Sequence, residues 1–248
     1  MKNNIKLIKR IQSIIPSHIK PKFTNEKDLL TWNQKKGFLS SRSILIRNKA
    51  IKIQKTLEKS GIKELYLNCS FENYKVFHSG QEKVLSSAKK YVKNFNNELS
   101  NFIFSGKPGT GKNHLAAAIG NYLILHGKKI LIITIADLMS KIKKTFQKNN
   151  NFTEEHFINK TSKVDLLIID EIGIQKESNY EKIIIHQIID RRSASKKSTG
   201  ILSNLNYNSL YKLLGERILD RMKLGKSLWL NFNWNSYRAN VSAKKLQV

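Results

Sequence analysis

Residues 106–113 constrain the fold more than any other part of this 248-residue chain. They read GKPGTGKN and fit the phosphate-binding loop G-x-x-x-x-G-K-[ST] at every position except the last. The apolar run at 102–104 predicts a buried strand before the loop, and residues 114–125 predict a helix after it. In that setting backbone N–H groups and a helix N-terminus face a bound anion. The sequence therefore predicts a phosphate site between a strand and a helix.

The last position of this loop departs from the usual pattern. It holds Asn113 where a Ser or Thr hydroxyl normally ligates magnesium, and an amide oxygen can take that place. Lys112 has the spacing expected of a lysine that contacts nucleotide phosphates. The predicted nucleotide-binding residues are Gly106, Lys107, Pro108, Gly109, Thr110, Gly111, Lys112 and Asn113.

Composition predicts a folded, cytoplasmic protein without a membrane segment. Hydrophobic residues make up 40% of the chain, and it has only three prolines. The single cysteine, Cys69, permits no internal disulfide, and the six histidines lack metal-ligand spacing. No apolar stretch reaches the roughly 18 residues of a membrane span or forms a signal-peptide core.

The formal net charge of +27 favours a nucleic-acid partner, because basic side chains that neutralise phosphates release counterions. Most of this charge comes from lysine, however, and a biased nucleotide composition of the source genome produces the same excess. The eight arginines are more informative, since lysine cannot replace a planar bidentate guanidinium at a phosphate or carboxylate. Five of them lie beyond residue 190.

Residues 1–60 are predicted to form a separate helical domain, with 15 basic and 3 acidic side chains. A first helix ends at Pro16, a second runs from about residue 24 or 25 to Gly37, and a third runs from a serine cap at 40 or 41 to Gly61. The third helix carries an apolar stripe. This stripe is either the packing face of a small bundle or a docking face for a partner helix. Its members are Ile46, Ala50, Ile53 and Leu57.

Residues 61–82 are predicted to be a connector whose Cys69, Phe71 and Tyr74 pack onto the next domain. From residue 83 onward short apolar runs alternate with helical stretches. Runs that are apolar on both faces and separated by helices indicate a parallel sheet with helices on either side. The fold class is therefore α/β, with five parallel strands in a domain spanning 83–248. The predicted strands end at or near 105, 134, 169, 202 and 230.

Two carboxylates follow a fully apolar strand in the segment DLLIIDE at 165–171. Ligands of such sheets bind at the carboxyl ends of the strands, so Asp170 and Glu171 are expected beside the phosphate loop. Asp170 would hold magnesium, and Glu171 would polarise the water that attacks the γ-phosphate. The alternative is a pair of solvated carboxylates that cap the next helix.

Three further sites, made up of four residues, are candidates for contact with a nucleotide. Asn204, after the fourth strand, could orient the attacking water, although Asn is also common in turns. Arg217 and Arg221 lie one helical turn apart, and an arginine from a neighbouring subunit can stabilise the transferred phosphoryl group. Pairing within the chain, such as Arg217 with Asp220, is the structural alternative. Arg238, after the last strand, is the third candidate.

The order of these motifs resembles AAA+ ATPases of the initiator and helicase-loader clade. Beyond the clade, several segments look like the DnaC family of bacterial replicative helicase loaders across nearly the whole chain, and that family also has Asn after the loop lysine. The matching segments are IIPSHIKPKF, NCSFENY, FIFSGKPGTGKNHLAAAI, IDEIG, LLGER, and SLW followed by FNW and SYR.

This resemblance implies an AAA+ P-loop ATPase that uses ATP and Mg²⁺, with slow turnover stimulated by single-stranded DNA. It also implies that the N-terminal domain grips a hexameric replicative helicase of the DnaB type, on which the protein self-associates. The family's magnesium aspartate falls on Asp170, its first sensor on Asn204, its trans arginine on Arg217 and its second sensor on Arg238. Its contacts to single-stranded DNA fall on Phe146, Ser178 and Tyr180. Phe146 stands among lysines, which suits base stacking, yet an aromatic in an amphipathic helix is usually part of the core.

One departure from the AAA+ superfamily is expected, because only about 18 residues follow Leu230 and these are too few for a helical lid. Two other functions stay open. The first is an ATPase that helps a transposase, a class that differs in the N-terminal segment, so that the match over 14–35 favours the loader. The second is a nucleotide-gated DNA-binding scaffold with negligible turnover, which a phosphate-release measurement separates from an enzyme.

Overall fold

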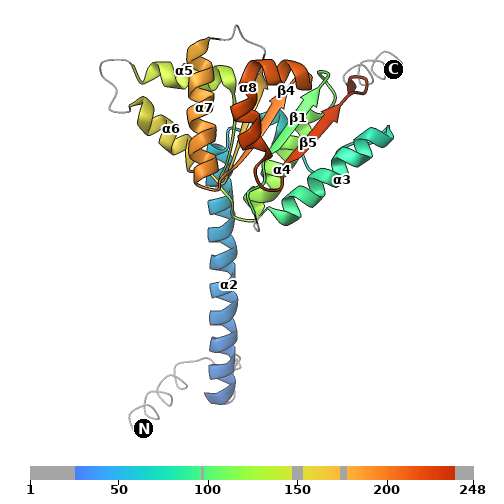
Figure 1. The fold of residues 1–248 in the computed structure, drawn as a ribbon. Coiled ribbons are helices and arrows are strands. Elements are labelled where there is room, and N and C mark those ends of the chain that lie inside the picture. Colours follow the sequence, from blue (N-terminus) through green and yellow to red (C-terminus); the bar gives the residue numbers. More distant parts are fainter. Residues whose placement is uncertain (1–25, 96–97, 147–152, 174–177, 238–248) are drawn as a thin grey trace. The chain divides into compact units, whose positions relative to one another are not determined.

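The computed structural model describes residues 26–95, 98–146, 153–173 and 178–237 (Figure 1). The chain divides into two compact units, Met1–Ile51 and Lys52–Val248. Among the described residues, none of the helices is both long and apolar enough to cross a membrane.

One long helix, α2 (Glu26–Lys59), contains all the described residues of the first unit. The predicted break at Gly37 and the predicted serine cap at 40 or 41 are therefore wrong. A single glycine costs a helix only about 1 kcal/mol relative to alanine, and the residues around it are mostly good helix formers. The hydroxyl of Ser43 donates to the carbonyl of Ser40, so both residues lie inside the helix and Ser40 does not begin it. The predicted first helix, up to Pro16, lies outside the described residues.

The described part of the first unit presents apolar side chains to solvent and forms no bundle. Of the predicted stripe, Ile53 and Leu57 pack against the core of the second unit, whereas Ile46 is 61% exposed. The exposed large apolar side chains of α2 are Leu30, Phe38, Leu39, Ile44, Leu45, Ile46 and Ile51.

The second unit is built on a parallel five-stranded sheet, as predicted, with strand order β2-β3-β4-β1-β5. This order places β1 between β4 and β5, with β3 beyond β4. The carboxyl ends of β3, β4 and β1 therefore lie next to one another along a single edge of the sheet. The strands are β1 (Phe102–Gly106), β2 (Ile130–Thr134), β3 (Leu166–Ile172), β4 (Ser198–Ser203) and β5 (Leu228–Phe232).

Two hydrophobic clusters divide between the faces of this sheet. Phe102 and Phe104 belong to the cluster that includes helices α3 and α4, whereas Ile103 between them belongs to the cluster of α5 to α8. This alternation follows from the two-residue period of a strand and explains why every strand is apolar on both faces. The helices are α3 (Ser79–Asn94), α4 (Lys112–Leu125), α5 (Ile135–Lys144), α6 (Glu154–Ser162), α7 (Asn179–Ala194) and α8 (Tyr207–Lys223) (Figure 1).

The connector packs on the core of the second unit, which confirms the prediction for Cys69, Phe71 and Tyr74. It contains one short 3₁₀ helix, η1 (Glu64–Tyr66). The side-chain amide of Asn121 in α4 donates to three backbone carbonyls of the connector, those of Tyr66, Leu67 and Cys69. Ser60, directly after α2, is bonded to the sheet, because the backbone N–H of Ile132 in β2 donates to the Ser60 carbonyl at 2.7 Å. The domain boundaries at residues 60 and 82 stay a prediction.

A fully buried arginine fixes the opposite end of the sheet. Arg192 of α7 is 0% exposed and donates to the hydroxyl of Thr199 at 3.0 Å. Its other donors go to backbone carbonyls at the end of α6 and at the starts of β3 and β4. These carbonyls belong to Thr161, Ser162, Val164, Asp165 and Ser198. Arg192 therefore holds α6, α7 and two strands together, a role that the sequence did not reveal.

Candidate functional site

The predicted phosphate loop joins β1 to α4 and has the backbone that its glycines permit. Gly106, Gly109 and Gly111 have φ angles of +122°, +74° and +95°. A Cβ on Gly106 would lie 2.5 Å from the carbonyl oxygen of Phe232, and one on Gly109 would clash with the Ser236 side chain. Both the dihedral angles and the close contacts therefore require glycine. The N-terminus of a 14-residue helix follows directly, which suits an anion.

Lys112 folds back over this loop. Its Nζ donates to the carbonyls of Gly106 and Lys107, each at 2.7 Å, and the residue is only 5% exposed. Burial lowers the pKa of Lys112 to about 8, while the Asp170 carboxylate opposes the shift. The lysine is thus held beside the loop as a cation that gains stability when a phosphate approaches.

The two predicted magnesium ligands, Asp170 and Asn113, lie in direct contact. Asn113 Nδ2 donates to Asp170 Oδ2 at 2.6 Å, and the backbone N–H of Glu171 donates to Asp170 Oδ1 at 2.7 Å. Burial raises the pKa of Asp170, and these hydrogen bonds oppose the rise. Among the described residues no cluster of three acidic, histidine or cysteine side chains could hold a metal alone. One carboxylate and one amide oxygen suit Mg²⁺, which takes its other ligands from water and phosphate.

Glu171 has an unusual backbone. Its φ angle is +63°, and the pairing of β3 with β4 shifts register between Ile169 and Ile172. A non-glycine residue in this region costs about 1–2 kcal/mol, so the surrounding strands must hold it there. The bulge interrupts the regular alternation of side chains at the two carboxylates. Asp170 and Glu171 belong to the last residues of β3 and do not cap the next helix.

Asn204 lies at the level of the phosphate loop. Ser203 of β4 pairs with Ser105 of β1, so Asn204 and Gly106 are the next residues along these neighbouring strands. Ser203 Oγ donates to the Ile172 carbonyl at 2.6 Å and accepts from the N–H of Leu205 at 3.1 Å, which fixes the turn. The structure thus brings Asn204 to the predicted edge, between the loop and the β3 carboxylates. Its role stays a prediction.

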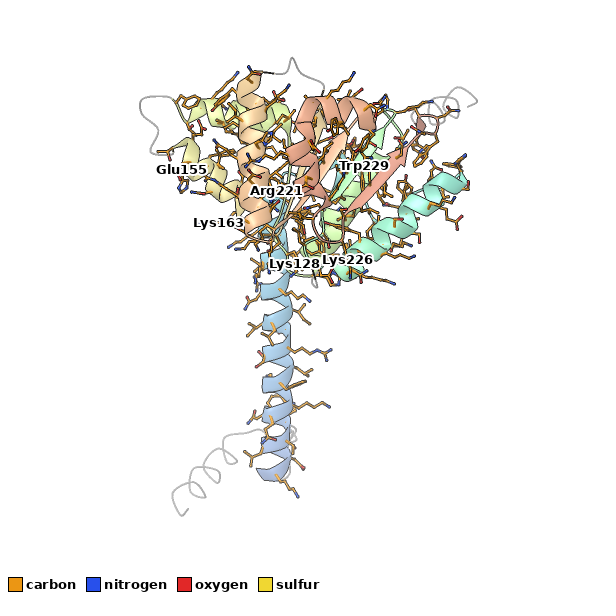
Figure 2. The ribbon with its side chains drawn as sticks, viewed as in Figure 1. Lys128, Glu155, Lys163, Arg221, Lys226 and Trp229 are labelled. Carbon is orange, nitrogen blue, oxygen red and sulfur yellow. The ribbon has the colours of Figure 1, made fainter. Side chains whose placement is uncertain are left out.

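The arginines of α8 contact a residue that the sequence did not suggest. Arg217 Nη2 lies 2.7 Å from Asp190 Oδ2, and Arg221 Nε lies 3.2 Å from Asp190 Oδ1. Arg217 is therefore paired within the chain, as the structural alternative expected, but its partner is Asp190 and not Asp220. Arg221 is labelled in Figure 2. Arg238 lies outside the described residues.

Two of the predicted DNA contacts lie together. The rings of Phe146 and Tyr180 are 6.4 Å apart, and Phe146 is 59% exposed, so the alternative that it belongs to the core is wrong. Tyr180 Oη donates to Glu154 Oε2 at 2.8 Å. Ser178 caps α7 by accepting from the backbone N–H of Glu181. The structure thus places the exposed ring of Phe146 beside the partly buried ring of Tyr180, near the beginning of α7.

Tyr74 is a residue that the sequence did not assign to the site. Its ring lies edge-on to His114 of α4 at 5.4 Å, and a Cβ on Gly111 would lie 3.1 Å from its Oη. That buried hydroxyl has no hydrogen-bond partner in the described part of the chain, and burial raises the pKa of Tyr74 to about 12. Trp234 Nε1 donates to the Thr110 carbonyl at 3.0 Å. The connector and the residues after β5 therefore enclose the loop. The only feature of the sequence that pointed to Tyr74 was that it is an aromatic residue in the connector.

Comparison with known proteins agrees with this geometry. The family described as IstB-like ATP binding protein matches residues 28–245. A replicative helicase loader DnaC from Buchnera aphidicola is 64% identical over 97% of this chain and 98% of that protein. A replicative helicase loader DnaC from Escherichia coli is 54% identical over 99% of this chain and all of that protein.

A solved structure shows the same fold. The crystal structure of a DnaC helicase loader matches with a TM-score of 0.61 at 24% identity, covering 68% of this chain and 99% of that one. These similarities extend well beyond the phosphate loop. The chain therefore belongs to the IstB-like ATP-binding proteins and, within them, to the DnaC family of replicative helicase loaders.

Proposed function

We propose that this protein uses ATP to load a hexameric replicative helicase onto single-stranded DNA. The observation that carries the proposal is the contact of Asn113 with Asp170 beside Lys112 and its glycine loop. This arrangement fits a nucleotide with its magnesium ion. It occurs in a chain that is similar to helicase loaders over nearly its full length, including the N-terminal segment. That extent favours the loader over a helper of a transposase.

The nucleotide chemistry follows from the positions of five side chains. Lys112 and the N-terminus of α4 bind the β- and γ-phosphates. Asp170 and Asn113 would hold Mg²⁺, which would supply positive charge against the phosphate oxygens. Glu171 accepts a proton from the attacking water as the bond between the γ-phosphorus and the β-phosphate oxygen breaks, which yields ADP and phosphate. Asn204, beside the loop, orients that water.

Stabilisation of the transferred phosphoryl group comes from a neighbouring subunit. Arg217 is engaged with Asp190 of its own chain and has a largely exposed side chain, so it is available to a neighbour. We infer that it contacts ATP bound to the next subunit when the protein self-associates on the helicase. An active site shared between subunits would couple hydrolysis to assembly.

DNA contact is assigned to the start of α7 and the end of α5. The exposed ring of Phe146 and the partly buried ring of Tyr180 beside it offer faces on which bases stack. The last turn of α5 carries Lys141, Lys143 and Lys144, which suit a phosphate backbone. Stacking and charge together fit single-stranded DNA without sequence preference.

Helicase contact is assigned to the N-terminal domain, residues 1–60. Phe38 and Leu45 of α2 are 66% and 68% exposed and lie seven residues apart, on one face of the helix. A helix with exposed apolar anchors can dock into an apolar groove of a partner. The helicase is the partner that the family membership suggests.

Loading can be tested on closed circular single-stranded DNA, which a closed helicase ring cannot thread. The wild-type protein with ATP is expected to place the helicase on the circle. The double variant Phe38→Ser, Leu45→Ser is expected to reduce helicase capture and loading at least about a hundredfold, because apolar anchors contribute about 2 kcal/mol each. Capture is measured by pull-down, and loading by the amount of helicase that remains on the circles.

Two controls separate the steps of this experiment. Lys35→Ser alters an exposed polar position of the same helix and is expected to leave capture unchanged. Lys112→Ala is expected to retain capture but to lose ATP-dependent loading. If the double variant captured and loaded the helicase as well as wild type, α2 would not be the docking helix. If wild type failed to load the helicase under any condition, the proposed function would be wrong.

Nucleotide affinity is expected to depend on pH through Lys112. Its pKa of about 8 means that the ammonium form, which binds phosphate, prevails below pH 8 and is lost above it. Raising the pH from 7 to 9 is therefore expected to weaken ATP binding about tenfold. Equilibrium titration with a fluorescent ATP analogue measures this change. Lys112→Met should bind weakly at every pH, and a pH-independent wild-type affinity would contradict the assignment.

A further inference from the structure

Two arginines of α8 share one carboxylate of α7. Arg217 reaches Asp190 Oδ2 through a terminal nitrogen at 2.7 Å, and Arg221 reaches Oδ1 through Nε at 3.2 Å. The Arg217 side chain is 69% exposed, whereas those of Arg221 and Asp190 are 41% and 30% exposed. Each arginine thus has its own carboxylate oxygen, and Arg217 is the outer member of the pair.

The shared carboxylate reduces the repulsion between the two arginines. Two cations at positions i and i+4 of a helix repel each other and would separate if nothing lay between them. Asp190 neutralises part of this charge and draws both guanidinium groups toward α7. When Arg217 leaves for another anion, Arg221 still pairs with Asp190, so the carboxylate is not left alone.

The backbone of α8 brings the arginines to this place. Gly215 interrupts the helix with a φ of +77°, and a Cβ there would meet nothing within 4 Å. The glycine is therefore needed for its conformation and not for space. It changes the direction of the helix just before Arg217, and the following turns pack on α7.

Asp190 itself stands on a fixed support. It lies two residues before Arg192, whose guanidinium is fully buried and bonded to five backbone carbonyls. Ile188 and Ile189 are also buried. The end of α7 can therefore define the position of a side chain on α8 more closely than the exposed surface of α8 could.

We propose that Asp190 is a positioning residue, which presents Arg217 to ATP bound by the neighbouring subunit. This inference rests on the proposed function, in which Arg217 acts in trans. An exposed ion pair contributes little free energy, so Arg217 can leave Asp190 and bind the phosphates of the neighbour's ATP. Arg221 then stays paired with Asp190. Asp190 thus acts in the subunit that donates the arginine and not in the one that holds the ATP.

The test measures phosphate release in the presence of a DnaB-type helicase and single-stranded DNA. Asp190→Asn is expected to lower stimulated turnover about tenfold, because misplacing a catalytic group by about 1 Å costs up to about a hundredfold. ATP binding to the variant should stay unchanged. Asp220→Asn removes the same charge from α8, where no ion pair of Asp220 is found among the described residues, and should behave as wild type. Asp190→Glu retains the charge and should recover most of the turnover.

Mixed assemblies distinguish positioning in trans from a structural role. Asp190→Asn subunits have an intact ATP site, and Lys112→Ala subunits have intact arginines, so a mixture of the two should regain activity. A mixture of Asp190→Asn with Arg217→Ala should not. Loss of ATP binding in Asp190→Asn, or failure of the first mixture, would overturn the inference.

A third mixture separates the inference from the function on which it rests. If Arg217→Ala and Lys112→Ala subunits complement each other while Asp190→Asn alone has wild-type turnover, only the role of Asp190 is wrong. If those two variants fail to complement at any ratio, the shared site of the proposed function is wrong as well, and the role of Asp190 fails with it.

Discussion

Replacing Glu171 with glutamine is expected to lower ATP turnover at least about a hundredfold, since a general base contributes about 10²–10⁴ to the rate. ATP binding should be retained, because Lys112 and the glycine loop are untouched. The bulge that sets Glu171 at a φ of +63° should persist in the variant, which has the same shape. Phosphate release with helicase and single-stranded DNA measures turnover, and a fluorescent ATP analogue measures binding.

Glu155→Gln is the matched control for this experiment. Glu155 lies on α6, where Figure 2 labels it, and its side chain is 73% exposed. It forms a surface ion pair with Arg191. Its turnover should equal that of wild type. If Glu171→Gln hydrolysed ATP at the wild-type rate, the base would have to be another group. Absence of turnover in the wild-type protein would favour the nucleotide-gated scaffold, which has no hydrolysis to lose.

Replacing Arg192 with methionine is expected to reduce the free energy of unfolding by roughly 3–5 kcal/mol. Methionine fills similar space but leaves the buried carbonyls that Arg192 bonds without a donor, and each unsatisfied group costs about 1 kcal/mol or more. Burial lowers the pKa of Arg192, and the Asp165 carboxylate opposes the shift. Chemical denaturation followed by circular dichroism measures the change.

The neighbouring residue provides the comparison for Arg192. Arg191 is partly exposed and makes a surface ion pair with Glu155 and a hydrogen bond to Asn159. Arg191→Met should therefore change the stability by about 1 kcal/mol or less. Equal effects of the two substitutions would show that the buried network contributes no more than a surface contact.

The sheet and the phosphate loop could be predicted because both are local patterns. The glycine spacing at 106–111 fixes backbone dihedral angles within a few residues, and a strand such as β2 is one uninterrupted apolar run. The position of Asn204 beside the loop followed from a general rule of parallel sheets. These features depend on neighbouring residues or on topology and need no knowledge of particular contacts.

The contacts that complete the site could not be predicted, because their partners are distant in sequence. Asn113 meets Asp170 across 57 positions, and Arg217 meets Asp190 across 27. The continuous helix through Gly37 shows a different limit. A glycine is a weak stop signal when good helix formers surround it, and its cost of about 1 kcal/mol is easily exceeded.

The hydrogen bond between Ser60, directly after α2, and strand β2 also affects the tendency to aggregate. Strand β2 is at the edge of the sheet and reads ILIIT, a short uncharged segment with high β-propensity. An open strand edge offers its N–H and C=O groups to a second chain. Here the Ser60 carbonyl occupies the N–H of Ile132, and a side chain at Gly61 would clash with the Ile132 carbonyl. Ser60 and Gly61 therefore hinder this edge from pairing with another copy of the protein.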